Sequence, residues 1–188
     1  MKSIVNIALV MTVIGQDRPG LIDSVAGIIV NHGGNWLESR MCHLGGQFAG
    51  ILRVEVNEGH HRALVDALNT LESQGLRIVV VADRPPAPAD EPRWSRLEIV
   101  GQDRPGIVRH ITHVLACYGV NVEELHTECR SAPMSGETLF QAEARLQIPP
   151  TCHLADLRQD LEKIASDLIV DITLAELSAA PTPDATRS

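Results

Sequence analysis

Two copies of one hexapeptide, Gly-Gln-Asp-Arg-Pro-Gly, carry much of the polar chemistry that this 188-residue sequence offers. They occupy residues 15–20 and 101–106, and each copy stands between an apolar run and an amphipathic one. A strand that ends at the first glycine and a helix that begins near the proline would leave the amides of the first helical turn free for an anion. The aspartate beside them can cap that helix or bind an ammonium group. This combination suits an α-amino acid.

The alternative interpretation is purely structural: the hexapeptide is only a strand-to-helix turn with a cap. Because the hexapeptide is identical in two halves that otherwise differ in sequence, we keep the ligand-binding interpretation as well as this one. Asn35 and Asn121 open the next predicted strand in each half. We expect both to come close to the hexapeptide, because a split β-α-β unit brings these elements together.

A second group of residues has the types that bind zinc. His110, His113 and Cys117 stand at i, i+3 and i+7 of a predicted helix, and His126 follows on a strand. The first half of the chain does not repeat this set, so we interpret these side chains as solvated or interfacial. The sequence has neither a P-loop nor a nucleophile elbow. We therefore predict no metal, no cofactor and no catalytic residues.

The elements that must position the hexapeptides repeat as well. When the two halves of the sequence are aligned with an offset of 86 residues, the apolar faces of the helices predicted after the two hexapeptides coincide. A glycine ends each of these helices, Gly33 in the first half and Gly119 in the second. The match resumes at an offset of 92, which places six extra residues between the second and third strands of the second copy. Gly45-Gly46 predicts a tight hairpin at that point of the first copy.

A second helix and a final strand complete each copy. Leu64, Leu68 and Leu71 mark this helix in the first copy, and the final strands are predicted over 76–82 and 168–177. The order β-α-β-β-α-β predicts an α+β fold: two tandem ferredoxin-like domains, each an antiparallel four-stranded sheet with both helices on one face. The predicted parts are domain 1 (1–84), a proline-rich linker (85–92), domain 2 (93–177) and a flexible tail (178–188).

Composition excludes several classes of function. The net charge of −8 would repel phosphate backbones and aromatic residues make up only 3%, so we expect no direct contact with nucleic acid. The four cysteines have no paired spacing and do not repeat between the copies, which favours free thiols in the cytoplasm. The apolar segment 4–14 is predicted to be a first strand rather than a signal peptide, and no segment is predicted to cross a membrane.

Each half of the chain resembles the ACT domain. The resemblance rests on a strand, then Gly-x-Asp-Arg-Pro-Gly, then an amphipathic helix, then Gly-x-Asn at the start of the next strand. Two tandem ACT domains with nothing attached resemble the glycine cleavage system transcriptional repressor family. The segment 132–136, which leads into Leu139-Phe140, is similar too. The resemblance implies a non-catalytic regulator that responds to a small amino acid, glycine first, and acts through a partner transcription factor.

The resemblance also implies where the ligand lies. In such modules it lies between two ACT domains, touching the loop after the first strand of one and the asparagine-bearing strand of the other, and a homo-oligomer is expected. We keep two alternatives: a stand-alone regulatory subunit of an amino-acid enzyme, and a purely protein-binding module. The candidate ligand-binding residues carried over are Asp17, Arg18, Pro19, Gly20, Leu21, Asn35, Asp103, Arg104, Pro105, Gly106, Ile107 and Asn121.

Overall fold

Alternating burial along the first strand of each half shows which face of its sheet holds the core. In β1 (Asn6–Gln16), Leu9, Met11 and Val13 are buried, whereas Thr12 and Ile14, which directly follow Met11 and Val13, are exposed. This period of two is what a strand requires when one face of its sheet is covered and the other is open. The computed structural model describes residues 5–84, 93–131 and 137–177.

The chain divides into two units, Met1–Pro86 and Ala87–Ser188. The first unit contains β1, α1 (Leu21–Asn31), β2 (Asn35–Leu44), β3 (Gln47–Asn57), α2 (Glu58–Asn69), the short 3-10 helix η1 (Thr70–Gln74) and β4 (Leu76–Ala82). The second unit contains β5 (Arg93–Gln102), α3 (Ile107–Cys117), β6 (Asn121–Ser131), β7 (Thr138–Ile148), α4 (Leu154–Leu168) and β8 (Val170–Leu177). The predicted linker (85–92) and tail (178–188) lie outside the described residues.

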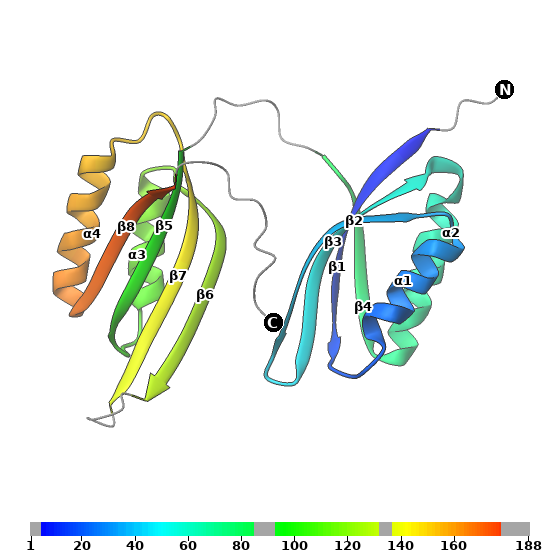
Figure 1. Cartoon of the computed structure of the whole chain (residues 1–188), viewed down its shortest axis with the longest axis horizontal. Helices are drawn as coiled ribbons and strands as arrows, with labels where there is room; N and C mark the ends of the chain where they lie inside the picture. The colour runs from blue at the N-terminus through cyan, green and yellow to red at the C-terminus, as the bar shows by residue number, and fades with distance from the viewer. Residues whose placement is uncertain (1–4, 85–92, 132–136, 178–188) are drawn as a thin grey trace. The chain divides into compact units, whose positions relative to one another are not determined.

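Each unit is a four-stranded antiparallel sheet, with the order β2-β3-β1-β4 in the first and β6-β7-β5-β8 in the second. Both helices of each unit lie on one side of its sheet (Figure 1). The predicted ferredoxin-like β-α-β-β-α-β fold is therefore confirmed for both halves. Among the described residues, no helix combines the length and apolar character that crossing a membrane requires.

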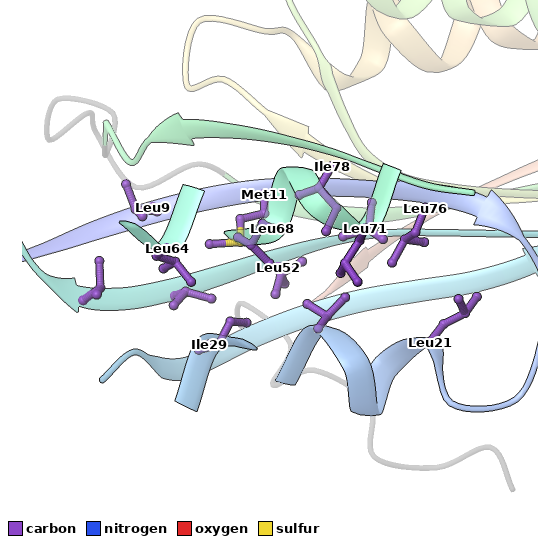
Figure 2. Packing of buried hydrophobic residues seen from close by; sticks show 14 of the residues in the cluster. Leu9, Met11, Leu21, Ile29, Leu52, Leu64, Leu68, Leu71, Leu76 and Ile78 are labelled. Carbon is purple, nitrogen blue, oxygen red and sulfur yellow. The ribbon is translucent and has the colours of Figure 1, made fainter. Parts of the chain in front are cut away.

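The two cores are built almost entirely of aliphatic side chains, as the low aromatic content requires. Figure 2 shows Leu64 and Leu68 of α2 and Ile29 of α1 with the buried side chains of the first sheet. Leu71, which the sequence placed in the second helix, lies one element later in η1 but is still buried. Likewise Leu168 ends α4 instead of beginning the last strand.

The predicted hairpin at Gly45-Gly46 is confirmed. Both glycines have positive φ, 58° and 75°, as a tight two-residue turn between β2 and β3 requires. In the second unit β6 ends at Ser131 and β7 begins at Thr138, so the connection is longer there. Residues 132–136 of this connection lie outside the described residues.

Candidate ligand-binding site

The helix after each hexapeptide begins at the hexapeptide's last glycine. Gly20 and Gly106 are the N-cap residues of α1 and α3, and their φ values of 88° and 99° lie in the left-handed region, where a side chain is strained. The sequence left two roles open for Asp17 and Asp103, capping the helix or binding an ammonium group. Neither aspartate is the N-cap residue, and neither N-cap has a side-chain cap hydrogen bond. The first-turn amides therefore keep the anion-binding character of a helix start.

The carbonyl of each cap glycine accepts two hydrogen bonds from the fourth residue that follows it. In the first unit both the backbone N and Oγ of Ser24 lie 2.9 Å from the Gly20 oxygen. In the second unit the backbone N of His110 lies 3.0 Å and its Nδ1 2.7 Å from the Gly106 oxygen. These bonds fix the direction in which the first helical turn presents its amides.

The first glycine of each hexapeptide serves a packing role that the sequence did not reveal. A Cβ at Gly15 would lie 2.5 Å from the carbonyl oxygen of Gly75, just before β4. A Cβ at Gly101 would lie 2.8 Å from Cα of Val170, the first residue of β8. Only glycine lets the last strand of each unit begin so close to the hexapeptide.

Asp17 is held at the turn between β2 and β3. Its backbone N donates to the carbonyl oxygen of Gly46 at 3.0 Å. Its carboxylate Oδ2 lies 3.6 Å from Nε2 of His43, an ion pair when the imidazole is protonated. Both side chains are exposed, so this pair adds little stability, but it orients the carboxylate. Nothing in the sequence pattern indicated His43.

Asp103 is anchored in the same way but lacks the histidine. Its backbone N donates to the carbonyl oxygen of Thr138, the first residue of β7, at 2.9 Å. The position that matches His43 is Cys129, since each of them is paired with the matching phenylalanine of the next strand. Among the described residues, no ion pair involves Asp103. The two loops thus share a backbone frame but differ in how their carboxylates are held.

The two arginines of the hexapeptides make hydrogen bonds to groups within their own unit. Arg18 Nη2 lies 3.4 Å from both the carbonyl oxygen and Oε1 of Gln74, at the end of η1. Arg104 Nη2 donates to Oε1 of Gln102 at 3.1 Å. Both arginines are exposed. The loop of the first unit is therefore tied to two neighbours, the β2–β3 turn and the η1–β4 connection.

The expectation that Asn35 and Asn121 lie beside the loop of their own unit is wrong. Asn35 is paired with Glu55, which is paired in turn with Ala8 of β1. Ala8 precedes Asp17 by nine residues, which is about 30 Å of extended strand. Asn121 has the same place in the second sheet, level with Trp94 of β5. Each asparagine begins an edge strand that runs parallel to the first strand, so it lies at the opposite end of the sheet.

The remaining candidates frame the helix starts. Leu21 and Ile107 are the first helical residues, and both are buried beneath the loop. Pro19 and Pro105 precede the cap glycines and are exposed. In each unit the loop and the helix start therefore lie together, without the asparagine.

The histidine and cysteine set of α3 does not form a metal site in the described part of the chain. His110 directs Nδ1 to the carbonyl oxygen of Gly106, which can only accept, so this nitrogen carries the proton. His113 Nε2 lies 3.9 Å from Sγ of Cys117, and His126 lies on β6. Across residues 5–84, 93–131 and 137–177, no three His, Cys, Asp or Glu side chains are grouped so that they could hold a metal ion.

With this fold and these loops described, the class of the protein is clear. The family model for the ACT domain matches residues 8–81 and again residues 97–175, so this chain belongs to the ACT domain family. It is a tandem ACT-domain protein similar to the glycine cleavage system transcriptional repressor of Escherichia coli (strain K12). The two are 22% identical over 166 residues, which cover 85% of each chain. The protein of the same name in Shigella flexneri matches equally.

Two solved structures cover almost the whole chain. A crystal structure of an unknown protein from Galdieria sulphuraria superposes with a TM-score of 0.79 and 32% identity, over 92% of this chain and 99% of that one. A crystal structure assigned provisionally as a glycine cleavage system transcriptional repressor gives a TM-score of 0.67 and 18% identity. It covers 92% of this chain and 98% of that one. At this identity the second likeness supports the fold alone.

Proposed function

We propose that this chain is a non-catalytic regulator in the cytoplasm that responds to a small amino acid and acts through a partner transcription factor. One observation carries the proposal: both units retain a glycine-capped helix start beside an aspartate whose backbone is fixed. The free amides suit a carboxylate, and Asp17 or Asp103 suits an ammonium group. The similarity to the glycine cleavage system transcriptional repressor makes glycine the first effector to test.

The register of the sheets supports a site shared by two ACT domains. Asn35 and Asp17 lie at opposite ends of one sheet, so one unit alone cannot offer both to a small ligand. β2 is an edge strand, and its free backbone groups can pair with another strand. If β2 paired antiparallel with the matching edge strand of another ACT domain, the asparagine of one would lie at the loop-bearing end of the other. An assembly of ACT domains is therefore part of the proposal.

Direct contact with nucleic acid is not part of the proposal. The chain carries a net charge of −8, and binding to DNA requires cationic groups that neutralise phosphates. Repression would then depend on a DNA-binding partner. Co-purification tests this: recovery of a transcription factor agrees with the proposal, and recovery of an amino-acid enzyme would favour a stand-alone regulatory subunit instead.

Calorimetric titration and thermal shift with glycine, serine and other small amino acids test the sensing function. A ligand that binds only the folded state must raise the unfolding temperature. We expect Asp17→Ala and Asp103→Ala to abolish the response of their own loop, whereas Asp66→Ala, an exposed aspartate of α2, leaves it unchanged. No heat and no thermal shift with any amino acid would favour the purely protein-binding module.

A further inference from the structure

The two hexapeptide loops are identical in sequence, but the helices that follow them differ in charge. The first turn of α1 contains Asp23, whereas the first turn of α3 contains no acidic residue. Arg109 has the place of Asp23, since each is the third residue of its helix. Both side chains are exposed. The start of α3 therefore carries a positive charge where the start of α1 carries a negative one.

This difference acts on the amides that suit the carboxylate of a ligand. Helical side chains lean towards the helix N-terminus, so Asp23 and Arg109 lean towards the loops before them. A basic side chain there adds to the attraction that a helix start exerts on an anion, and an acidic one opposes it. His110 follows Arg109 and adds positive charge when its ring is protonated, whereas α1 has the uncharged Ser24 at that place. A carboxylate is therefore favoured at the loop of the second unit.

The aspartates that suit the ammonium group also differ in their surroundings. His43 Nε2 lies 3.6 Å from Oδ2 of Asp17, so the imidazole lies beside this carboxylate and offsets its charge when protonated. At the place of His43 the second unit has Cys129, an exposed free thiol that brings no positive charge. An ammonium group must therefore compete with His43 for Asp17, whereas it meets Asp103 without that competitor.

We propose that the two loops bind an amino acid unequally, and that the loop of the second unit is the tighter site. Both differences act in this direction, because Arg109 favours the carboxylate and Asp103 is open to the ammonium group. This inference rests on the proposed function and adds which loop the effector fills first. A charge at a helix end changes affinity a few-fold, so its reversal, together with the competition from His43, should separate the two dissociation constants by about tenfold.

Calorimetric titration of the full chain with glycine at neutral pH tests the inequality. Glycine has no side chain, so it probes the contacts to the carboxylate and the ammonium group alone. Asp17→Ala leaves the loop of the second unit intact, and Asp103→Ala leaves that of the first, so each variant reports one site. We expect the Asp17→Ala chain to bind glycine about tenfold more tightly than the Asp103→Ala chain.

Exchange of the differing residues tests whether they cause the inequality. In the Asp103→Ala chain, Asp23→Arg together with His43→Cys gives the first loop the surroundings of the second. We expect this exchange to raise its affinity for glycine by about tenfold. In the Asp17→Ala chain, Arg109→Asp should weaken binding by about threefold or more.

Asp66→Arg is the matched control for Asp23→Arg. It makes the same change of net charge at an exposed position of α2, outside both loops, and should leave the affinity of the Asp103→Ala chain unchanged. If circular dichroism shows that the exchanged chain does not fold, the reverse exchange decides the matter. In that exchange Cys129→His, at an exposed position, should weaken binding by the Asp17→Ala chain.

The outcomes separate this inference from the proposed function. Equal affinities of the two single-loop chains, or tighter binding by the loop of the first unit, would overturn the inference and leave the proposed function standing. The same holds if folded exchange variants bind glycine like their parents. Binding at neither loop would count against the proposed function itself, and this inference would fall with it.

Discussion

Ile169 and Gly75 occupy the same position in the two units, and both adopt a left-handed backbone conformation. Ile169 directly precedes β8, whose first residue is paired with Gly101. Gly75 directly precedes β4, whose first residue is paired with Gly15. Their φ values are 56° and 82°. Ile169 is the one non-glycine residue with positive φ in the described part of the chain. A β-branched side chain is costly there, whereas glycine is not.

Ile169→Gly is therefore expected to stabilise the second unit. Relief of about 1–2 kcal/mol of backbone strain outweighs the extra unfolded-state entropy of glycine, for a net gain of about 0.5–1 kcal/mol. The side chain is 63% exposed, so little burial is lost. Each unit contains one of the two tryptophans, and Trp94 fluorescence in a Trp36→Phe background reports denaturation of the second unit. A lower midpoint than that of the parent would contradict the strain argument.

Gly15→Ala should destabilise the first unit by about 1–3 kcal/mol, since the new methyl group would meet the carbonyl oxygen of Gly75 at 2.5 Å and force β1 and β4 apart. Gly27→Ala is the matched control. Gly27 lies within α1, and a Cβ added there would have no neighbour within 4 Å, so alanine should add about 0.5–1 kcal/mol of stability. Urea denaturation followed by Trp36 in a Trp94→Phe background measures both changes. Equal effects of the two alanines would show that the close approach is unimportant.

Ser95→Ala is expected to stabilise the second unit by about 1 kcal/mol. Ser95 is fully buried, and its Oγ has no hydrogen-bond partner, so the hydroxyl is desolvated without compensation. The matching residue of the first unit is Leu9, which is also fully buried. Leu9→Ala should instead cost about 2–5 kcal/mol, because it leaves a cavity. Differential scanning calorimetry of the two variants checks the opposite signs.

The features that the sequence predicted well depend on local patterns. Apolar periodicity in the helices and strands predicted the fold, and Gly45-Gly46 predicted the hairpin, because a two-residue turn is specified by its own residues. The repeated hexapeptide also predicted where the helices begin. Ile169 shows the limit of such rules, because tertiary contacts hold it in a conformation that its residue type disfavours.

The candidate site was predicted only in part, because its geometry depends on contacts between distant segments. Asn35 was expected beside the loop, but the direction of β2 in the sheet carries it to the far end. The sequence left open whether Asp17 caps α1 or binds a ligand, whereas in the structure a left-handed Gly20 is the N-cap and the Asp17 carboxylate lies near His43. No periodicity or motif in the sequence encodes that ion pair, since it arises from the meeting of a loop and a hairpin.

The sole tyrosine of the chain, Tyr118, joins the end of α3 to α4. Its hydroxyl donates to Asp160 Oδ2 at 2.7 Å, and Lys163 Nζ lies 2.8 Å from the other carboxylate oxygen. The hydrogen bond to Asp160, together with partial burial and nearby negative charge, raises the pKa of Tyr118 to about 12. Hydrogen bonds from Lys163 and then Tyr118 lower the pKa of the Asp160 carboxyl.

These two shifts predict where stability depends on pH. The neutral phenol is favoured in the folded chain, so its contribution is complete below the ordinary tyrosine pKa of about 10 and is lost as the pH rises towards about 12. The Asp160 contribution is present above the ordinary aspartate pKa and is lost as the pH falls through the lowered value. Tyr118→Phe should remove the part of the alkaline dependence that Tyr118 causes, leaving the part due to Cys152, whose thiol pKa is raised by burial. It should also weaken the acid dependence, as denaturation midpoints across the pH range will show.

Direct titration of Tyr118 checks the cause of the shift. Phenolate absorbance reports this group alone, because the chain has no other tyrosine. Asp160→Asn removes the charge and weakens the acceptor, so the pKa of Tyr118 should fall from about 12 towards 10. Asp156→Asn is the control: this residue acts on Tyr118 only through its charge and more weakly than Asp160, so its removal should lower the pKa much less. A wild-type pKa near 10, or equal shifts in the two variants, would show that the hydrogen bond between α3 and α4 does not hold the proton.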